Sequence, residues 1–244
     1  MSGSGKGTLR IDDIRPYKAA PAAVTPADPG TGVLSLLYKM EADVTDSSGK
    51  GNHGSPQGGP IYVDGPVGYG QALQFDGIDD HVELPIGNLI STMASGSLAI
   101  WVNLNTSNSG FWERIFDFGT SSTAGYMFLS PRQSTNGTMR FAITTGTNTG
   151  ESGVNSPTAL PAGWHHAAVV IDGTAKTLQL CLDGEVVAGG PTAVLPKDLG
   201  KTTQNWLGRS QWSSDAFFAG ILDDFRIYTR ALSTGEVRYL AGDR

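Results

Sequence analysis

Short apolar runs recur along the chain from residue 33 onward, separated by clusters of Gly, Asn, Asp and Ser. Several runs alternate apolar with polar residues, which is the period of a half-buried β-strand. The strands predicted from this pattern span residues 33–40, 72–75, 81–84, 97–104, 114–118, 126–129, 139–144, 164–171, 177–182, 185–188, 206–207 and 217–228. Their number and spacing favour an all-β fold, a two-sheet antiparallel β-sandwich or jelly roll.

A second regularity marks the stretch from residue 164 to residue 188. Two Asp-Gly pairs divide it into three alternating segments, and Asp-Gly is a favoured sequence for tight hairpin turns. This stretch is therefore predicted to form a three-stranded meander. Helical signals are sparse. Ser233 followed by Glu236 has the spacing of a capping box, so one short helix is expected near the C-terminal end.

The composition agrees with many short strands joined by tight turns. The chain has 244 residues, including 33 glycines and 13 prolines, and only 16% of its residues are charged. All-β sandwiches of ~200–250 residues fold as single domains, so one main domain is expected. The 39% of hydrophobic residues can build a core. The single cysteine, Cys181, excludes an internal disulfide and is predicted to be a buried, unreactive thiol.

Charge and hydropathy narrow the class of partner. The formal net charge is −6, so no basic stripe is available to neutralise phosphates, and a nucleic-acid partner is not expected. No run approaches the ~20 apolar residues of a membrane span, and membrane insertion is not expected. The first ten residues lack the apolar stretch of a signal peptide. We expect that such a segment was removed or that the chain starts within a longer protein.

Three segments are predicted along the chain. Residues 33–244 form the main domain, and residues 19–32, rich in Ala, Pro and Gly, are predicted to be a linker. Residues 1–18 contain Ile11–Tyr17 (IDDIRPY), which echoes Leu222–Tyr228 (LDDFRIY). One hypothesis is that residues 1–18 carry the final strand of a preceding β domain. The alternatives are a tag and a chance likeness.

Five motifs appear in an order that resembles a known family: DSSGKGNHG (46–54), ALQFDGIDDHVEL (72–84), SLAIWVNL (97–104), GWHHAAVVIDG with LQLCLDGEVV (163–187), and GILDDFRIYTRALS (220–233). They resemble the successive motifs of laminin-G-like, concanavalin A-type jelly-roll domains of bacterial extracellular proteins, over about residues 33–242. The resemblance implies a two-sheet jelly roll joined to other domains in secreted or cell-surface proteins that are carbohydrate-active or adhesive.

The same resemblance implies a structural Ca²⁺ between the first strands and the last. The matching positions are Asp46, Gly51 and Asn52 in the DSSGKGN segment, and Asp223 in the closing strand. Calcium takes six to eight oxygen ligands, which Asp, Asn and loop carbonyls supply. The segment lacks the spacing of an EF-hand loop. The alternative is that Asp46 makes an Asx-turn and Asp223 a hydrogen bond at the end of a strand.

A second acidic cluster contains Asp76, Asp79 and Asp80, between two short predicted strands. We interpret it as turn chemistry around Gly77, with metal binding as the open alternative.

Glycoside hydrolases also use this fold, so a catalytic role is the third hypothesis. Retaining enzymes need two carboxyl groups ~5–5.5 Å apart. The segment closest to a glycosidase motif is residues 41–46 (EADVTD), which ends in aspartate and is interpreted instead as the polar end of the first strand. No Gly-x-Ser-x-Gly motif is present. The sequence therefore predicts a protein that is not an enzyme.

Aromatic side chains in polar loops are the candidates for ligand contact, because sugar rings stack on aromatic faces while polar groups take the hydroxyls. Trp112 and Trp212 lie in Gly- and Ser-rich segments, with Tyr126, Arg132 and Arg209 as candidate polar partners. The alternative is that the two tryptophans fold back over the core.

These observations lead to a non-catalytic, calcium-stabilised recognition module of a larger extracellular or cell-surface protein. Carbohydrate is the expected ligand, and a protein surface comes next. The alternative is a structural or adhesion spacer without a small ligand, and a glycoside hydrolase is the third hypothesis.

Overall fold

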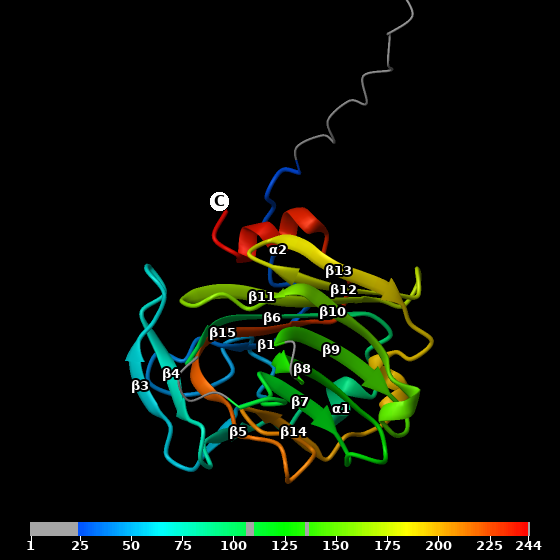
Figure 1. Cartoon of the computed structure of the whole chain (residues 1–244). Coiled ribbons are helices and arrows are strands. Elements are labelled where there is room, and N and C mark those ends of the chain that lie inside the picture. Colours follow the sequence, from blue (N-terminus) through cyan, green and yellow to red (C-terminus); the bar gives the residue numbers. More distant parts are fainter. Residues whose placement is uncertain (1–23, 106–109, 135–136, 244) are drawn as a thin grey trace, which may run out of the picture.

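Two antiparallel β-sheets stack on each other and enclose the core (Figure 1). The structure, a computed structural model, describes residues 24–105, 110–134 and 137–243. Within them one sheet has eight strands and the other seven. The predicted two-sheet antiparallel β-sandwich of the jelly-roll type is confirmed. Ile11–Tyr17 and residues 19–23 of the predicted linker lie outside the described residues.

The strands of the two sheets are interleaved along the chain. The eight-stranded sheet runs in the order β13 (Glu185–Pro191), β12 (Thr177–Leu182), β11 (Trp164–Asp172), β6 (Gly96–Leu104), β15 (Ala219–Tyr228), β4 (Gln71–Asp76) and β3 (Ile61–Asp64), with β1 (Leu34–Tyr38) paired to β15. The seven-stranded sheet runs in the order β10 (Ser152–Ala159), β9 (Thr138–Thr144), β8 (Tyr126–Gln133), β7 (Phe116–Gly119), β14 (Gln204–Leu207), β5 (His81–Glu83) and β2 (Ser55–Gln57).

Alternation along the strands builds the core. In β6, Leu98 and Ile100 point inward, and from the facing sheet Met127 and Leu129 of β8 do the same. Each fully buried aliphatic side chain stabilises the fold by ~1.5–3 kcal/mol. The predicted meander of β11, β12 and β13 is present, with antiparallel pairing throughout.

Three strands escaped prediction, namely β2, β3 and β10. All three lie at the edges of their sheets, where one side of the backbone has no neighbouring strand. β10 reads SGVNSPTA, and its polar residues and its proline are typical of an edge strand that resists pairing with another chain. β2 and β10 carry little of the apolar periodicity on which the prediction depended.

The predicted C-terminal helix, α2 (Thr234–Leu240), covers part of the outer face of the eight-stranded sheet. Its Val237 and Leu240 are buried in one cluster with Ala168 and Cys181. The predicted capping box is present, because Ser233 accepts a hydrogen bond from the Glu236 N–H and Glu236 accepts one from the Ser233 N–H. Cys181 is buried as predicted, and burial raises the pKa of its thiol to about 12.

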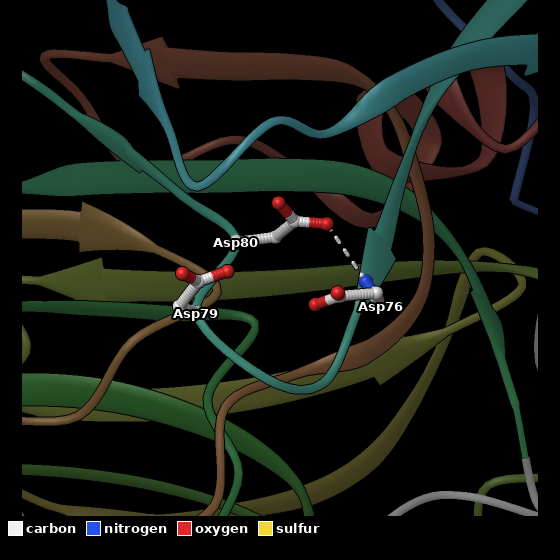
Figure 2. A group of neighbouring side chains, drawn as sticks. All are labelled: Asp76, Asp79 and Asp80. Carbon is white, nitrogen blue, oxygen red and sulfur yellow. Dashed lines mark hydrogen bonds between the residues drawn. The ribbon is translucent and has the colours of Figure 1, made fainter.

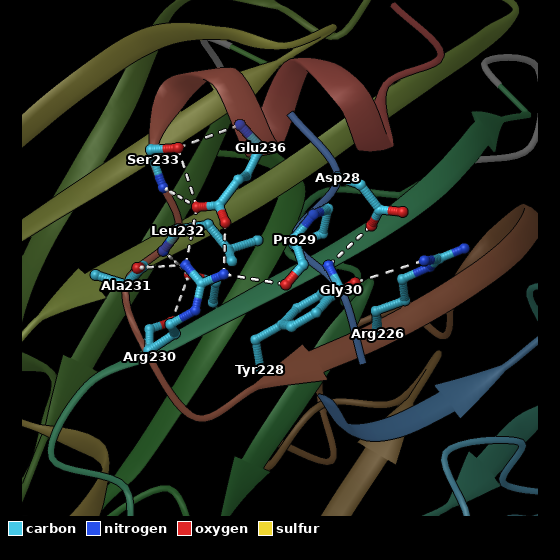
Figure 3. A network of polar contacts seen from close by, with 11 residues as sticks. Asp28, Pro29, Gly30, Arg226, Tyr228, Arg230, Ala231, Leu232, Ser233 and Glu236 are labelled. Atoms are coloured by element: carbon cyan, nitrogen blue, oxygen red, sulfur yellow. Dashed lines mark hydrogen bonds and ion pairs between the residues drawn. The ribbon is translucent and has the colours of Figure 1, made fainter. Parts of the chain in front are cut away.

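An ion pair fixes the start of α2 to the segment that follows β15. Arg230 binds the Glu236 carboxylate through both terminal nitrogens and also donates to the Pro29 carbonyl at 3.2 Å (Figure 3). These bonds to Arg230 and Ser233 lower the pKa of Glu236 to about 2. The described residues at the end of the predicted linker thus lie against the closing segment. The other helical segments are α1 (Gly87–Ile90) and two 3₁₀ turns, Asn148–Gly150 and Pro196–Leu199.

A β-bulge interrupts β15 where it pairs with β6. The register shifts between Asp223 and Arg226, and Asp224 has a left-handed φ of 49°. A bulge changes the direction in which neighbouring side chains point. It leaves Asp223 fully buried, whereas Asp224 forms a bidentate pair with Arg226.

Candidate functional site

Four aromatic side chains gather on the outer face of the seven-stranded sheet. The alternation in β8 that sends Met127 into the core turns Tyr126 and Phe128 to this outer face. Trp112 and Trp212 come from loops and pack on them. The ring centroids of Tyr126 and Trp212 lie 4.8 Å apart, and those of Trp112 and Phe128 lie 6.4 Å apart, both edge to face.

The backbone at Trp112 is in the left-handed region, with φ at 63°. Such a conformation costs ~1–3 kcal/mol in a residue with a side chain. It is held by the Trp112 N–H, which donates to the Arg132 carbonyl at 2.8 Å, and by Arg114, which donates to the Trp112 carbonyl. The fold thus holds this indole over the outer face of the sheet at a conformational cost.

Arg114 forms the charged floor beneath the two tryptophans. Its side chain is 2% exposed, and its guanidinium lies 4.1 Å from the Phe128 ring centroid. It donates to Asp117 at 3.2 Å and to Asp215 at 3.0 Å. Burial raises the pKa of Asp117 to about 7, and the Arg114 charge and a hydrogen bond from the Gln211 N–H oppose that rise. The Asp117 Oδ1 has no hydrogen-bond partner.

A second polar network closes the other side. Glu151 accepts hydrogen bonds from Arg140 at 2.6 Å and from the Tyr126 hydroxyl at 2.6 Å. Arg140 also donates to the Asn155 amide oxygen at 2.9 Å. Burial and the nearby Glu151 carboxylate raise the pKa of Tyr126, so its hydroxyl keeps its proton.

Together these groups enclose a pocket of about 340 Å³, lined by Trp112, Arg114, Phe128, Gln133, Arg140, Asn148, Glu151, Trp212 and Asp215. A depression of about 230 Å³ adjoins it and shares Trp212 and Asp215. Ligand pockets of ~300–1,000 Å³ commonly combine aromatic walls with a few polar groups. We call these nine residues the aromatic pocket.

The five predicted ligand residues occupy different places around it. Trp112 and Trp212 are half-buried and line the aromatic pocket, but Tyr126 is fully buried beneath Trp212. Arg132 stacks on Phe111 at 5.3 Å, and Arg209 lies in the adjoining depression, 4.4 Å from the Trp206 ring centroid. Their part in binding stays a prediction. The tryptophans do fold over apolar residues, yet they cover the outer aromatic cluster and not the core between the sheets.

The sequence reasoning missed Arg114, Arg140 and Glu151. Arg140 could have been found, because it alternates with Met139 and Phe141, which point into the core. Arg114 and Asp117 are three residues apart, but Asp215 comes from a loop 101 positions further along the chain, and no local pattern predicts that the three meet.

The predicted calcium ligand Asp46 is surrounded by N–H donors. Its carboxylate accepts from the backbone of Leu37 at 3.1 Å, Ser48 at 2.9 Å and Asn52 at 3.0 Å, and these bonds lower its pKa. The Asn52 carbonyl accepts from the Tyr38 hydroxyl, and Gly51 supplies a left-handed turn at φ 77°. Calcium requires oxygen ligands. The groups aimed at Asp46 therefore fit the Asx-turn interpretation and do not fit a cation.

Asp223 lies in a different environment. Its Oδ2 is buried and has no hydrogen-bond partner, and burial raises its pKa to about 8. It lines a cleft of about 260 Å³ together with Glu41, which also raises its pKa. A Cβ atom at Gly65 would lie 3.2 Å from this Oδ2 and 3.0 Å from the Gly70 carbonyl, so oxygens converge there. Lys39 lines the same cleft.

The cluster of Asp76, Asp79 and Asp80 could hold a metal ion. One carboxylate oxygen from each residue lies within 4.8 Å of the other two (Figure 2). Asp80 accepts a hydrogen bond from the Asp76 N–H at 2.9 Å, and Asp76 accepts one from the Ile78 N–H at 2.8 Å. These are the turn contacts that the preferred interpretation of the sequence expected.

The carboxylates of the glycosidase-like segment do not lie on a regular strand. β1 ends at Tyr38, and residues 41–43 form bends, so the expectation of a polar strand end there is wrong. Glu41 accepts a hydrogen bond from the Gln71 N–H at 3.0 Å and faces the Asp223 cleft. The described residues include no helix long and apolar enough to cross a membrane.

Comparisons with known proteins point to one superfamily. A family model described as the concanavalin A-like lectin/glucanases superfamily (Laminin_G_3) matches residues 76–238. Among curated proteins, none matches the sequence.

Solved structures with a similar fold include domain 4 of an extracellular arabinanase from Geobacillus stearothermophilus, in complex with arabinotriose. The TM-score is 0.70 at 22% identity, over 85% of this chain and 98% of that one. A carbohydrate-binding module of a Ruminococcus gnavus sialidase, bound to sialyllactose, has a TM-score of 0.60 at 13% identity, over 75% of this chain and 98% of that one. The receptor-binding domain of a botulinum neurotoxin mosaic has a TM-score of 0.66 at 14% sequence identity, over 88% of this chain but 52% of its own length. At these identities the likeness shows a shared fold.

Proposed function

The chain belongs to the concanavalin A-like lectin/glucanases superfamily through its Laminin_G_3 match, and we propose that it is a non-catalytic carbohydrate-recognition module that binds glycans in the aromatic pocket. The observation that carries the proposal is the pair of half-buried tryptophans, Trp112 and Trp212, held over a pocket with polar groups at its base. Indole faces suit the apolar face of a sugar ring, and the carboxylates and amides suit its hydroxyls.

The similar structures support this proposal by analogy of fold. One is the fourth domain of an extracellular arabinanase in complex with arabinotriose, and another is a carbohydrate-binding module of a sialidase bound to sialyllactose. By that analogy the chain serves as one domain of a larger extracellular protein. The aromatic pocket favours this function over a spacer without a ligand. The left-handed backbone of Trp112 costs free energy, and a spacer would gain nothing from that cost.

The test is binding to a glycan array, repeated with Trp212→Ala. The wild type is expected to bind at least one glycan class, and the variant to lose at least tenfold in affinity, since an aromatic anchor contributes ~2 kcal/mol or more. Asn148→Ala changes an exposed lining residue and serves as a second, milder variant. Trp164→Ala is the matched control on the other sheet. Loss of binding in Trp164→Ala with none in Trp212→Ala would contradict the assignment.

We further propose that a structural Ca²⁺ binds in the cleft between Glu41 and Asp223. The unpartnered Asp223 Oδ2, the Glu41 carboxylate and the nearby Gly70 carbonyl are oxygens of the type that calcium prefers. The cation would neutralise a buried carboxylate and tie the last strand to the segment after the first. It is placed here and not at Asp46, where N–H donors point inward.

Thermal melting with calcium and with EDTA tests the cation site. At a concentration ten times Kd, a ligand stabilises the folded state by ~1.4 kcal/mol. The wild type should show this shift, and Asp223→Asn should lose it. Asp76→Asn, which alters the exposed acidic cluster, should keep it. An unchanged wild-type midpoint would rule out structural calcium, and a loss confined to Asp76→Asn would move the site to that cluster.

A further inference from the structure

Both guanidinium groups that line the aromatic pocket are already paired with carboxylates. Arg114 is shared between Asp117 and Asp215, and Arg140 is bound to Glu151 at 2.6 Å. These side chains are largely buried: Arg114 is 2% exposed, Arg140 19% and Glu151 9%. Charge-assisted hydrogen bonds between such groups are short and directional, so the two cations are held in place.

An anionic ligand would therefore find no spare positive charge in the pocket. Three carboxylates face two guanidinium groups, and even with Asp117 protonated the charges only balance. A ligand carboxylate at Arg114 or Arg140 would either displace a protein carboxylate, leaving it buried and unpaired, or share the guanidinium with it. In the second case two carboxylates would lie side by side in a largely buried site and repel each other. The formal charge of −6 on the whole chain adds long-range repulsion.

The groups that remain open to a ligand are acceptors, amides and aromatic faces. The carboxylates of Glu151 and Asp215 line the pocket and have lone pairs that can accept hydrogen bonds from hydroxyl groups, and Gln133 and Asn148 contribute side-chain amides. This set matches a ligand rich in hydroxyl groups and without charge.

We propose that the aromatic pocket selects uncharged sugars and discriminates against sugars that carry a carboxylate, such as sialic and uronic acids; this inference rests on the proposed glycan-binding function. Glu151 and Asp215 act as the specificity-determining carboxylates. They accept hydrogen bonds from sugar hydroxyls, and their ion pairs with Arg114 and Arg140 neutralise the two guanidinium groups.

Arg209, a cation beside this pocket, could be an exception. It lies in the adjoining depression, 4.4 Å from the Trp206 ring centroid and 3.3 Å from the His81 Nε2. In the described part of the chain no carboxylate pairs with it. An acidic sugar that bound this protein would be expected to use Arg209, and the experiment includes a variant there.

The experiment compares matched glycans that differ by one acidic residue. Lactose and sialyllactose form one pair, and neutral and glucuronic-acid-substituted xylo-oligosaccharides form another, all measured on the full chain together with an array of neutral glycans. The neutral glycan that binds is expected to bind at least tenfold more tightly than its acidic counterpart. Glu151→Gln keeps a hydrogen-bond acceptor but releases the charge of Arg140, so it should reduce that ratio at least threefold while the protein stays folded by thermal melting.

The outcomes separate this inference from the proposed function. If no glycan of either class binds, the function and the inference fail together. If glycans bind and the acidic member of a pair binds as tightly as the neutral one or more tightly, only the inference fails. Acidic-glycan binding that is abolished by Arg209→Gln would place that specificity in the adjoining depression. A neutral preference that Glu151→Gln leaves unchanged would refute the role of the paired carboxylates.

Discussion

The buried ion pair beneath the aromatic pocket allows the loss of stability in a variant to be predicted in magnitude. Replacing Arg114 with methionine keeps much of the side-chain volume and the contact with Phe128, but it removes the partner of Asp117, which is 0% exposed. Breaking a buried ion pair from one side costs ~3–5 kcal/mol, because the remaining charge is left without compensation. For a domain of this size, each 1 kcal/mol lowers Tm by roughly 2–4 °C, so a decrease of about 6–20 °C is expected.

Urea denaturation of Arg114→Met, Asp117→Asn and the double variant measures this cost. The double variant should recover at least half of the loss, because the fully buried charge of Asp117 is gone, while Asp215 is 16% exposed and keeps its hydrogen bond from the Ser210 hydroxyl. The sign of the pH dependence is also fixed. Burial raises the pKa of Asp117 to about 7 in the folded protein, above the ordinary aspartate value. Without Arg114 this pKa rises further, so the deficit of Arg114→Met should be larger at pH 8 than at pH 5. A loss below ~1 kcal/mol, or no recovery in the double variant, would refute the reasoning.

Two further predictions concern ionisable groups away from the pocket. Glu236→Gln should lower the free energy of unfolding by about 1 kcal/mol near neutral pH, a modest amount because its Arg230 partner is partly exposed. The pKa of Glu236 is lowered to about 2 in the folded protein, so this difference in stability should vanish as pH falls from 4.5 to 2, as measured by urea denaturation. Burial lowers the pKa of His166 to about 3, so the stability of the wild type should fall as pH drops from 6.5 toward 3. His166→Phe keeps an aromatic ring against Trp101 but has no proton to bind, so calorimetry should show a smaller loss of stability for this variant over the same pH range. An equal acid response in wild type and His166→Phe would contradict this account.

The fold was largely predictable because its signals are local. Alternating apolar residues located the central strands, and the Asp-Gly pairs located the turns of the meander. The family resemblance drawn from five short motifs is confirmed by the match over residues 76–238. Predicted and observed strand boundaries differ by at most four residues, and the largest difference is in β8, which continues through a polar segment to Gln133.

The candidate sites were predictable only in part, for a physical reason. Loop tryptophans can be recognised in a sequence, and Trp112 and Trp212 do meet over one pocket. Their charged surroundings depend on long-range contacts: Arg114 and Asp215 are 101 positions apart. The motif around Asp46 was interpreted as an oxygen cage, yet the same residues fold so that N–H groups converge on the carboxylate. Composition alone does not distinguish these two arrangements.

The most direct test of the central claim is a crystal structure of the protein with the neutral oligosaccharide that binds it best. The sugar is predicted to lie against Trp112 and Trp212, with its hydroxyls donating to Glu151 or Asp215. A sugar bound anywhere else, such as on the outer face of the eight-stranded sheet beside Trp101 and Trp164, with the aromatic pocket unoccupied, would contradict the account.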